Sequence, residues 1–170
     1  MLEAAILAAL EAVYTSDKLA IGSLDWKGDR AHPRILRIPL ACDCGASISG
    51  ASIIGTAYRD EPNRRVSFQL CADVDGKDYR IARIDWRPNV PHTNRYGVNR
   101  GLSLYTSVHD FPENAALGLE IMQTQNLPIV CAIDPEPDDF TALLGVLRDK
   151  FKVVNALDVP VPQWSFTLPL

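Results

Sequence analysis

A pair of strands between residues 66 and 86 constrains the fold of this chain more than any other segment. From Val66 to Val74, apolar residues occupy every even position and polar residues occupy most odd positions, a pattern typical of a strand with one buried face. Both residues of Asp75-Gly76 tolerate a positive φ, so they predict a two-residue hairpin turn, with the returning strand at Tyr79 to Trp86. The apolar parity changes within that second strand, and we expect a β-bulge near Arg83 to absorb the change. The centre of the chain is therefore expected to form an antiparallel sheet.

The segments before this hairpin predict one helix and two further strands. Apolar residues recur at helical spacing between residues 2 and 14, which indicates an amphipathic helix that covers a sheet. Residues 34–40 predict a strand bent near Pro39, and residues 48–58 predict a strand rich in small residues.

The segments after the hairpin predict two helices separated by a strand. Asp110 would cap the first helix, with Glu113 completing a capping box. Leu127 to Ile133 predicts a buried strand. The acidic residues 134–139 would then open the second helix, which carries an apolar stripe from Phe140 to Phe151. The whole order predicts an α+β fold, in which an N-terminal helix and two C-terminal helices pack on a mainly antiparallel sheet.

Composition favours one globular unit. The chain has 170 residues, of which 47% are apolar and 22% charged, so we expect residues 1–170 to form a single domain. No apolar run approaches the roughly 18 residues that a membrane-spanning helix needs, and the first residues lack the basic start of a secretory leader. The four cysteines show no paired CxxC spacing and are interpreted as ordinary thiols. We therefore expect a cytoplasmic protein without membrane contact.

Three short motifs resemble cofactor or metal sites but lack a residue that each site requires. Gly45 to Ser52 has the glycine spacing of a phosphate loop, but Ala51 stands where the lysine belongs. Asp73 to Gly76 begins like a calcium loop, and no closing glutamate follows at the required place. Cys42 and Cys44 would give zinc two ligands without a second close pair. We therefore expect no cofactor and no metal.

Charge is distributed unevenly along the chain. The formal net charge is −4, yet the segment from Arg59 to Arg100 carries nine Lys or Arg against six Asp or Glu. Eight of those nine bases are arginine, whose planar guanidinium suits phosphate or carboxylate. The segment is either a local anion site or a solvated strand face with ordinary surface ion pairs.

Two histidines lie in or beside this basic segment. Seventeen residues separate His92 from His109, a distance along the chain that a loop and a short return strand can close so that the two rings come into contact. One imidazole would then take the proton of a 2′-hydroxyl and the other would protonate the leaving oxygen, as in metal-free phosphodiester cleavage. An arginine would stabilise the charged phosphorane. The expected substrate-binding residues are Arg83, Asn94, Arg95 and Arg100. In the alternative interpretation, His109 packs at a helix start and His92 sits in a turn.

The motifs Arg83-Ile-Asp85, His92-Thr-Asn94 and His109-Asp-Phe111 resemble a group of small uncharacterised bacterial proteins that are often associated with mobile elements. The shared pattern is Arg-x-Asp, His-x-Asn and His-x-aromatic, and it covers about residues 79–115. Thr93 stands where that group has an arginine. The resemblance implies a common site at these residues and no particular activity.

Two main hypotheses follow for the function. The first is an RNA- or nucleotide-directed protein, in its most specific form a metal-independent endoribonuclease of the toxin kind with an antitoxin as its partner. The second is a non-catalytic interaction module, such as an inhibitor or adaptor of a host or phage complex, that engages a protein through acidic flanks and through Trp164 and Phe166. A metal-dependent hydrolase built on Asp134, Glu136 and their neighbours comes third, because helix capping explains those acids more simply.

Overall fold

The structure is a computed structural model that describes residues 2–28, 33–42, 48–124 and 126–165. Its elements follow one another in the order α1 (Leu2–Thr15), β1 (Leu19–Ala20), β2 (Arg34–Ala41), β3 (Ile48–Ala57), β4 (Val66–Val74), β5 (Lys77–Trp86), β6 (His92–Thr93), β7 (Ser103–Leu104), β8 (Ser107–His109), α2 (Phe111–Ala115), α3 (Leu119–Met122), β9 (Cys131–Ala132), α4 (Phe140–Phe151) and the 3-10 helix η1 (Ala156–Asp158).

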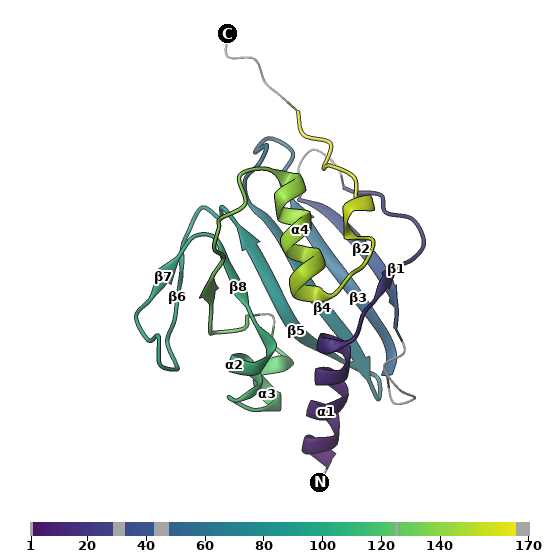
Figure 1. Ribbon diagram of the computed structural model, residues 1–170, viewed down its shortest axis with the longest axis vertical. Coiled ribbons are helices and arrows are strands. Elements are labelled where there is room, and N and C mark those ends of the chain that lie inside the picture. Colours follow the sequence, from purple (N-terminus) through teal and green to yellow (C-terminus); the bar gives the residue numbers. More distant parts are fainter. Residues whose placement is uncertain (1, 29–32, 43–47, 125, 166–170) are drawn as a thin grey trace.

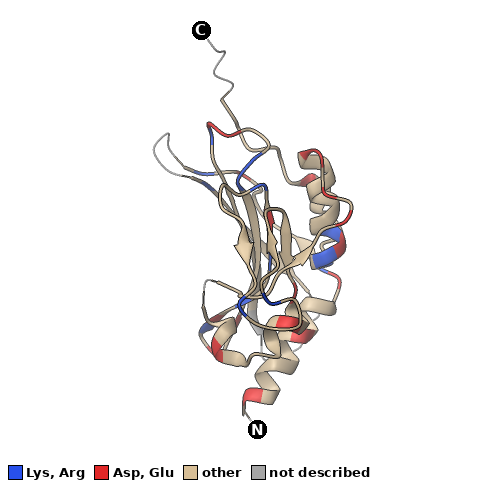
Figure 2. Ribbon diagram, turned by 90° about the vertical axis from the view of Figure 1, so that its left-hand side faces the viewer, with Lys and Arg blue, Asp and Glu red and all other residues tan. Residues whose placement is uncertain are grey.

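One antiparallel sheet organises the molecule, in the spatial order β1-β2-β3-β4-β5-β8-β9. The strands β6 and β7 form a separate hairpin beside it. Figures 1 and 2 show α4 lying over one side of the sheet, with α1 below it near the N-terminus. The predicted α+β class with a mainly antiparallel sheet is confirmed.

The central hairpin forms as predicted. Val74 pairs with Lys77 across the turn, and Asp75 and Gly76 have φ values of 53° and 74°, the conformation that a two-residue turn between twisted strands requires. The register shifts between Leu70 and Cys71, which leaves Ile81 as the extra residue of β5. The predicted bulge therefore exists, two residues before Arg83.

The core lies between the sheet and the helices. The even residues of β4 face it, as the period of two predicts, and α1 contributes Ile6, Leu10 and Val13. In α4 the predicted stripe from Phe140 to Phe151 is buried. In β2 the alternation continues through Pro39 up to Ala41.

The capping predictions need correction. The Asp110 side chain caps no helix. Instead, its Oδ1 accepts a hydrogen bond from the Tyr14 hydroxyl at 2.8 Å and its Oδ2 contacts Lys150 Nζ at 3.1 Å. The expected helix beyond it forms as two short helices, α2 and α3. Of the acidic residues 134–139, only Asp139 caps α4, where its Oδ1 accepts from the Ala142 N–H.

The predicted strand at residues 127–133 is reduced to Cys131–Ala132. Leu127, Ile129 and Val130 are buried as expected, but the backbone of residues 127–130 pairs with no neighbouring strand. Side chains supply its hydrogen bonds instead, and those side chains include most of the predicted site.

Gly145 lies in the interior of α4, where glycine is an unfavourable residue. A Cβ built on Gly145 meets no atom within 4 Å, so Gly145→Ala is expected to stabilise the protein by about 1 kcal/mol through helix propensity alone. The melting temperature should rise by a few degrees. The matched control is Gly55→Ala, whose Cβ would lie 3.0 Å from both Phe68 and Trp26 and should lower that temperature. Equal melting temperatures for the two variants would contradict this description of α4.

Candidate functional site

The predicted site residues of the sheet lie on the face opposite the helices. Arg83 and Asp85 alternate with Ile84 on β5, and β8 pairs His109 with Arg83. Ile84 and its partner Val108 belong to the core beneath the helices. Because side chains alternate along a strand, Arg83, Asp85 and His109 share the other face.

Asp85 is the centre of a buried charged cluster. Its Oδ1 accepts from Arg83 Nε at 2.8 Å, and its Oδ2 lies 3.1 Å from His109 Nε2. Burial alone would raise the pKa of Asp85, but the hydrogen bond from His109 and the charge of Arg83 outweigh burial and hold this pKa below its usual value. The carboxylate is therefore ionised and accepts from both neighbours.

His109 lies wholly inside the protein. Its ring has no exposed surface, and its Nδ1 lies 2.5 Å from the carbonyl oxygen of Leu127. Each ring nitrogen therefore faces an acceptor, the Leu127 carbonyl at Nδ1 and the Asp85 carboxylate at Nε2. In this conformation His109 offers no free nitrogen to a substrate. Its predicted role as a proton donor in catalysis would require the ring to be uncovered.

His92 lies against His109 but is partly open to solvent. The ring centroids are 4.7 Å apart and the rings meet edge to face, at 81°. His92 Nε2 lies 3.1 Å from the Pro128 carbonyl oxygen, so Nε2 carries the proton and Nδ1 keeps its lone pair. No other hydrogen bond to this ring occurs in the described part of the chain. Partial burial lowers the pKa of His92, and the proximity of His109 lowers it further.

Asn94 is buried and holds the same segment as the two histidines. Its side-chain amide donates to the Val130 carbonyl at 2.9 Å and accepts from the Val130 N–H at 2.7 Å. Asn114, which the sequence did not single out, makes the same pair of bonds with Ile129.

The backbone of residues 127–130 is thus held by four side chains, His109, His92, Asn114 and Asn94, in the order of the residues that they bind. We refer to this set as the side-chain clamp. It replaces the strand that the sequence predicted, and it satisfies buried backbone groups that would otherwise lose their hydrogen bonds. Its members are therefore structural residues, whatever else His92 does.

The predicted arginines are spread over separate places. His92 and Arg95 line one pocket of about 500 Å³, together with Tyr96, Thr124 and Asn126 among others. Arg83 lines a different pocket of about 290 Å³, beside Arg65 and Asn89. The two pockets share no residue, so Arg83 and Arg95 do not line one common cavity. Arg100 is exposed on the β6–β7 hairpin.

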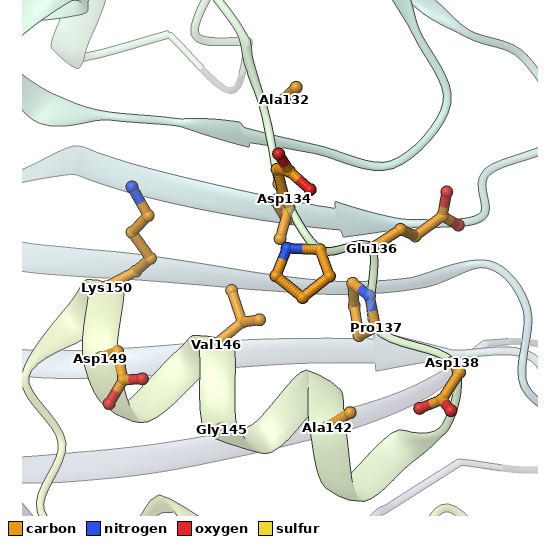
Figure 3. Close-up of a pocket in the computed structure, with 12 residues that line it drawn as sticks. Ala132, Asp134, Glu136, Pro137, Asp138, Ala142, Gly145, Val146, Asp149 and Lys150 are labelled. Atoms are coloured by element: carbon orange, nitrogen blue, oxygen red, sulfur yellow. The ribbon is translucent and has the colours of Figure 1, made fainter.

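The acidic group of residues 134–138 borders a third pocket, of about 660 Å³, between the 132–138 segment and α4 (Figure 3). Glu136 is already engaged by the Thr106 hydroxyl at 2.8 Å and by Arg87 at 3.5 Å. Within the described ranges, no three His, Cys, Asp or Glu side chains gather as a metal site would require. The hypothesis of a metal-dependent hydrolase has no geometric support in this group.

The cysteines of the described residues differ in their bonding. Cys71 and Cys131 are free thiols, whereas Cys42 is disulfide-bonded and so is not the ordinary thiol that was expected. Burial raises the pKa of the Cys71 thiol to about 11. Cys44 and most of the glycine-rich run 45–52 lie outside the described residues.

Of the helices that the structure describes, none has both the length and the apolar character to span a bilayer.

Comparison with known proteins adds no assignment: no protein-family model, curated protein or solved structure matches this chain. The resemblance over residues 79–115 stays a prediction.

Proposed function

We propose that the protein binds RNA or a nucleotide at the pocket lined by His92 and Arg95, and that His92 is its acid–base group. One observation carries this proposal. His92, whose Nδ1 keeps its lone pair, lines a pocket of about 500 Å³ together with Arg95, and no Asp or Glu occurs from residue 86 to residue 109. A cavity of this volume is large enough for one nucleotide.

In its most specific form the proposal is metal-independent cleavage of RNA. His92 Nδ1 takes the proton of the 2′-hydroxyl, the 2′-oxygen attacks phosphorus, and the bond to the 5′-oxygen breaks. The leaving oxygen is protonated by water, and the products are a 2′,3′-cyclic phosphate and a 5′-hydroxyl. Arg95 stabilises the charge that grows on the phosphoryl oxygens. His109 acts as a positioning residue, because it packs against the His92 ring edge to face.

The test is cleavage of single-stranded RNA by the purified full chain in EDTA. We expect His92→Ala to reduce the rate by at least 100-fold, the usual contribution of a general base. The lowered pKa of His92 means that the unprotonated ring, which is the active form, is already dominant at pH 7. The rate should therefore rise with pH through a midpoint below 6.5 and stay level above it.

The matched control for charge is a pair of substitutions. Arg95→Ala should slow cleavage, whereas Lys77→Ala, which removes an exposed charge from the β4–β5 turn, should leave the rate unchanged. Cleavage that survives in His92→Ala, or that requires a divalent cation, defeats the catalytic form of the proposal.

The alternative is a non-catalytic interaction module, and one observation favours it. Val98 is fully exposed and Val90 three-quarters exposed, in the same segment that carries His92. The C-terminal arm gives less support than the sequence suggested, because the ring of Trp164 packs at 90° against Phe140 with 5.7 Å between centroids. Phe166 lies outside the described residues. A stable stoichiometric protein complex, together with no hydrolysis of RNA, would establish this alternative.

A further inference from the structure

The β6–β7 hairpin stands out from the body of the molecule. Figure 1 shows it at the left-hand edge of the molecule. Every residue from Arg95 to Ser103 is exposed, and Tyr105 follows with 58% of its surface exposed. We define residues 94–105 as the arm.

The base of the arm is fixed. Asn94 is buried and held to Val130 by both ends of its amide. Its backbone N–H donates to the Leu102 carbonyl and its carbonyl accepts from the Gly101 N–H, both at 2.9 Å. Within the loop, the Leu102 N–H donates to the Asn99 carbonyl at 3.0 Å. An exposed surface on a fixed base loses little conformational freedom on binding, which favours affinity.

The exposed surface of the arm combines arginine with tyrosine. Arg95 and Arg100 form no ion pair with any described residue, and the arm has no acidic residue. The side chains of Tyr96 and Tyr105 are half or more exposed. Positively charged and exposed aromatic side chains on one segment are typical of proteins that bind single-stranded nucleic acid, where the charges contact the phosphates and the rings stack on bases.

We propose that the arm binds a single-stranded segment of RNA, with one nucleotide in the His92 pocket and neighbouring bases stacked on Tyr96 and Tyr105. This rests on the proposed function and names the form of its substrate. Bases in a duplex are already stacked and expose only their edges, so the tyrosine rings would find no partner there. Proteins instead recognise duplex RNA by its shape and its phosphates over about 16 base pairs. Two arginines on one arm do not provide so long a contact surface.

The pocket also offers polar groups to a base. The Asn126 side chain lines it together with Arg95 and Tyr96, and an amide carries both a donor and an acceptor for the edge of an unpaired base. The Thr124 hydroxyl lines the same pocket and donates to the carbonyl oxygens of Ile121 and Asn126, so its oxygen remains as an acceptor.

The experiment is fluorescence anisotropy with a fluorescein-labelled 12-nucleotide 2′-fluoro RNA, which lacks the nucleophilic hydroxyl and is not cleaved. We expect the full chain to bind the single strand at least tenfold more tightly than the same RNA in a duplex. The double variant Tyr96→Ala, Tyr105→Ala should weaken binding of the single strand by about 5- to 100-fold for each ring that stacks. The matched double variant to phenylalanine keeps both rings and should bind within about twofold of the natural chain. Unchanged melting temperatures would show that all of these variants fold.

Failure of this inference and failure of the proposed function give different results. Equal affinity for single strand and duplex, or no loss of RNA affinity in the alanine double variant, overturns the inference that bases stack on the arm. His92-dependent cleavage would be unaffected by either result. Absence of both RNA binding and cleavage overturns the two together. Binding of a poly-glutamate peptide with the affinity expected for RNA would assign the arm to an acidic protein partner and overturn the inference.

Discussion

Replacing Asp85 with alanine is expected to lower the free energy of unfolding by about 3–5 kcal/mol, the usual cost of removing one partner from a buried ion pair. The carboxylate lies between Arg83 and His109, and the His109 ring has no exposed surface. Without Asp85, the Arg83 guanidinium and the buried Nε2 of His109 would both lose the carboxylate that they contact. The measurement is equilibrium unfolding in urea at pH 7.

The matched control is Asp78→Ala on the same strand. Asp78 pairs with Arg80 at the surface, where an ion pair is worth less than about 1 kcal/mol. If both variants lose the same stability, the Asp85 cluster is not a buried pair in solution.

The Asp85 prediction also has a definite pH dependence. The pKa of Asp85 is lowered in the folded state, so the folded protein binds fewer protons here than the unfolded chain does as the pH approaches the carboxyl range. The stability that this group contributes is therefore complete above the unfolded pKa of about 3.9 and is lost as the pH falls through the folded value. The difference in stability between the natural chain and Asp85→Ala should be present at pH 5 and shrink below pH 4.

The elements predicted correctly are those whose burial follows a regular pattern of apolar residues within one segment. Val66 to Val74 alternates because one face of β4 is buried, and the stripe from Phe140 to Phe151 repeats because one side of α4 is buried. Both patterns can be recognised within one short stretch of the sequence. Asp75-Gly76 is equally local, because the turn needs two residues that accept a positive φ.

For residues 127–130, the sequence pattern predicts burial correctly but not the hydrogen bonds of the backbone. Its apolar residues are buried as in a strand, but its hydrogen-bond partners come from three separate segments, at residues 92–94, 109 and 114. Periodicity records burial and carries no information about which groups bind the backbone. A buried asparagine has the donor and acceptor that one peptide unit needs, but Asn94 and Asn114 lie 36 and 15 residues before the groups that they bind, so no local pattern marks them.

The same reasoning explains the outcome for the histidines. The sequence spacing allowed His92 and His109 to meet without requiring it, and the rings do meet. Burial of His109 depends on the Leu127 segment that covers it, and no local pattern records that contact. The proposed function therefore assigns the acid–base role to the outer ring, His92, whose Nδ1 keeps its lone pair.

Replacing Asn94 with alanine is expected to lower the free energy of unfolding by about 2–6 kcal/mol, because it leaves the buried N–H and carbonyl of Val130 without partners, each at about 1–3 kcal/mol. The exposed Asn99→Ala, in the same loop, should change stability by less than about 0.5 kcal/mol. Hydrogen exchange gives the specific readout, since the Val130 amide should lose its protection in Asn94→Ala and keep it in Asn99→Ala.

The variant Asn94→Asp separates the two hydrogen bonds of this amide. At pH 7 an aspartate still accepts from the Val130 N–H but turns its other oxygen toward the Val130 carbonyl, so we expect a loss of stability close to that of the alanine variant. Protonation of that oxygen restores a donor, and the loss relative to the natural chain should therefore diminish as the pH falls toward 4. Because the clamp also holds Pro128, the partner of His92 Nε2, any cleavage of RNA should weaken in step with protection of the Val130 amide. A variant that loses this protection and keeps full activity would show that the clamp and the His92 site are independent.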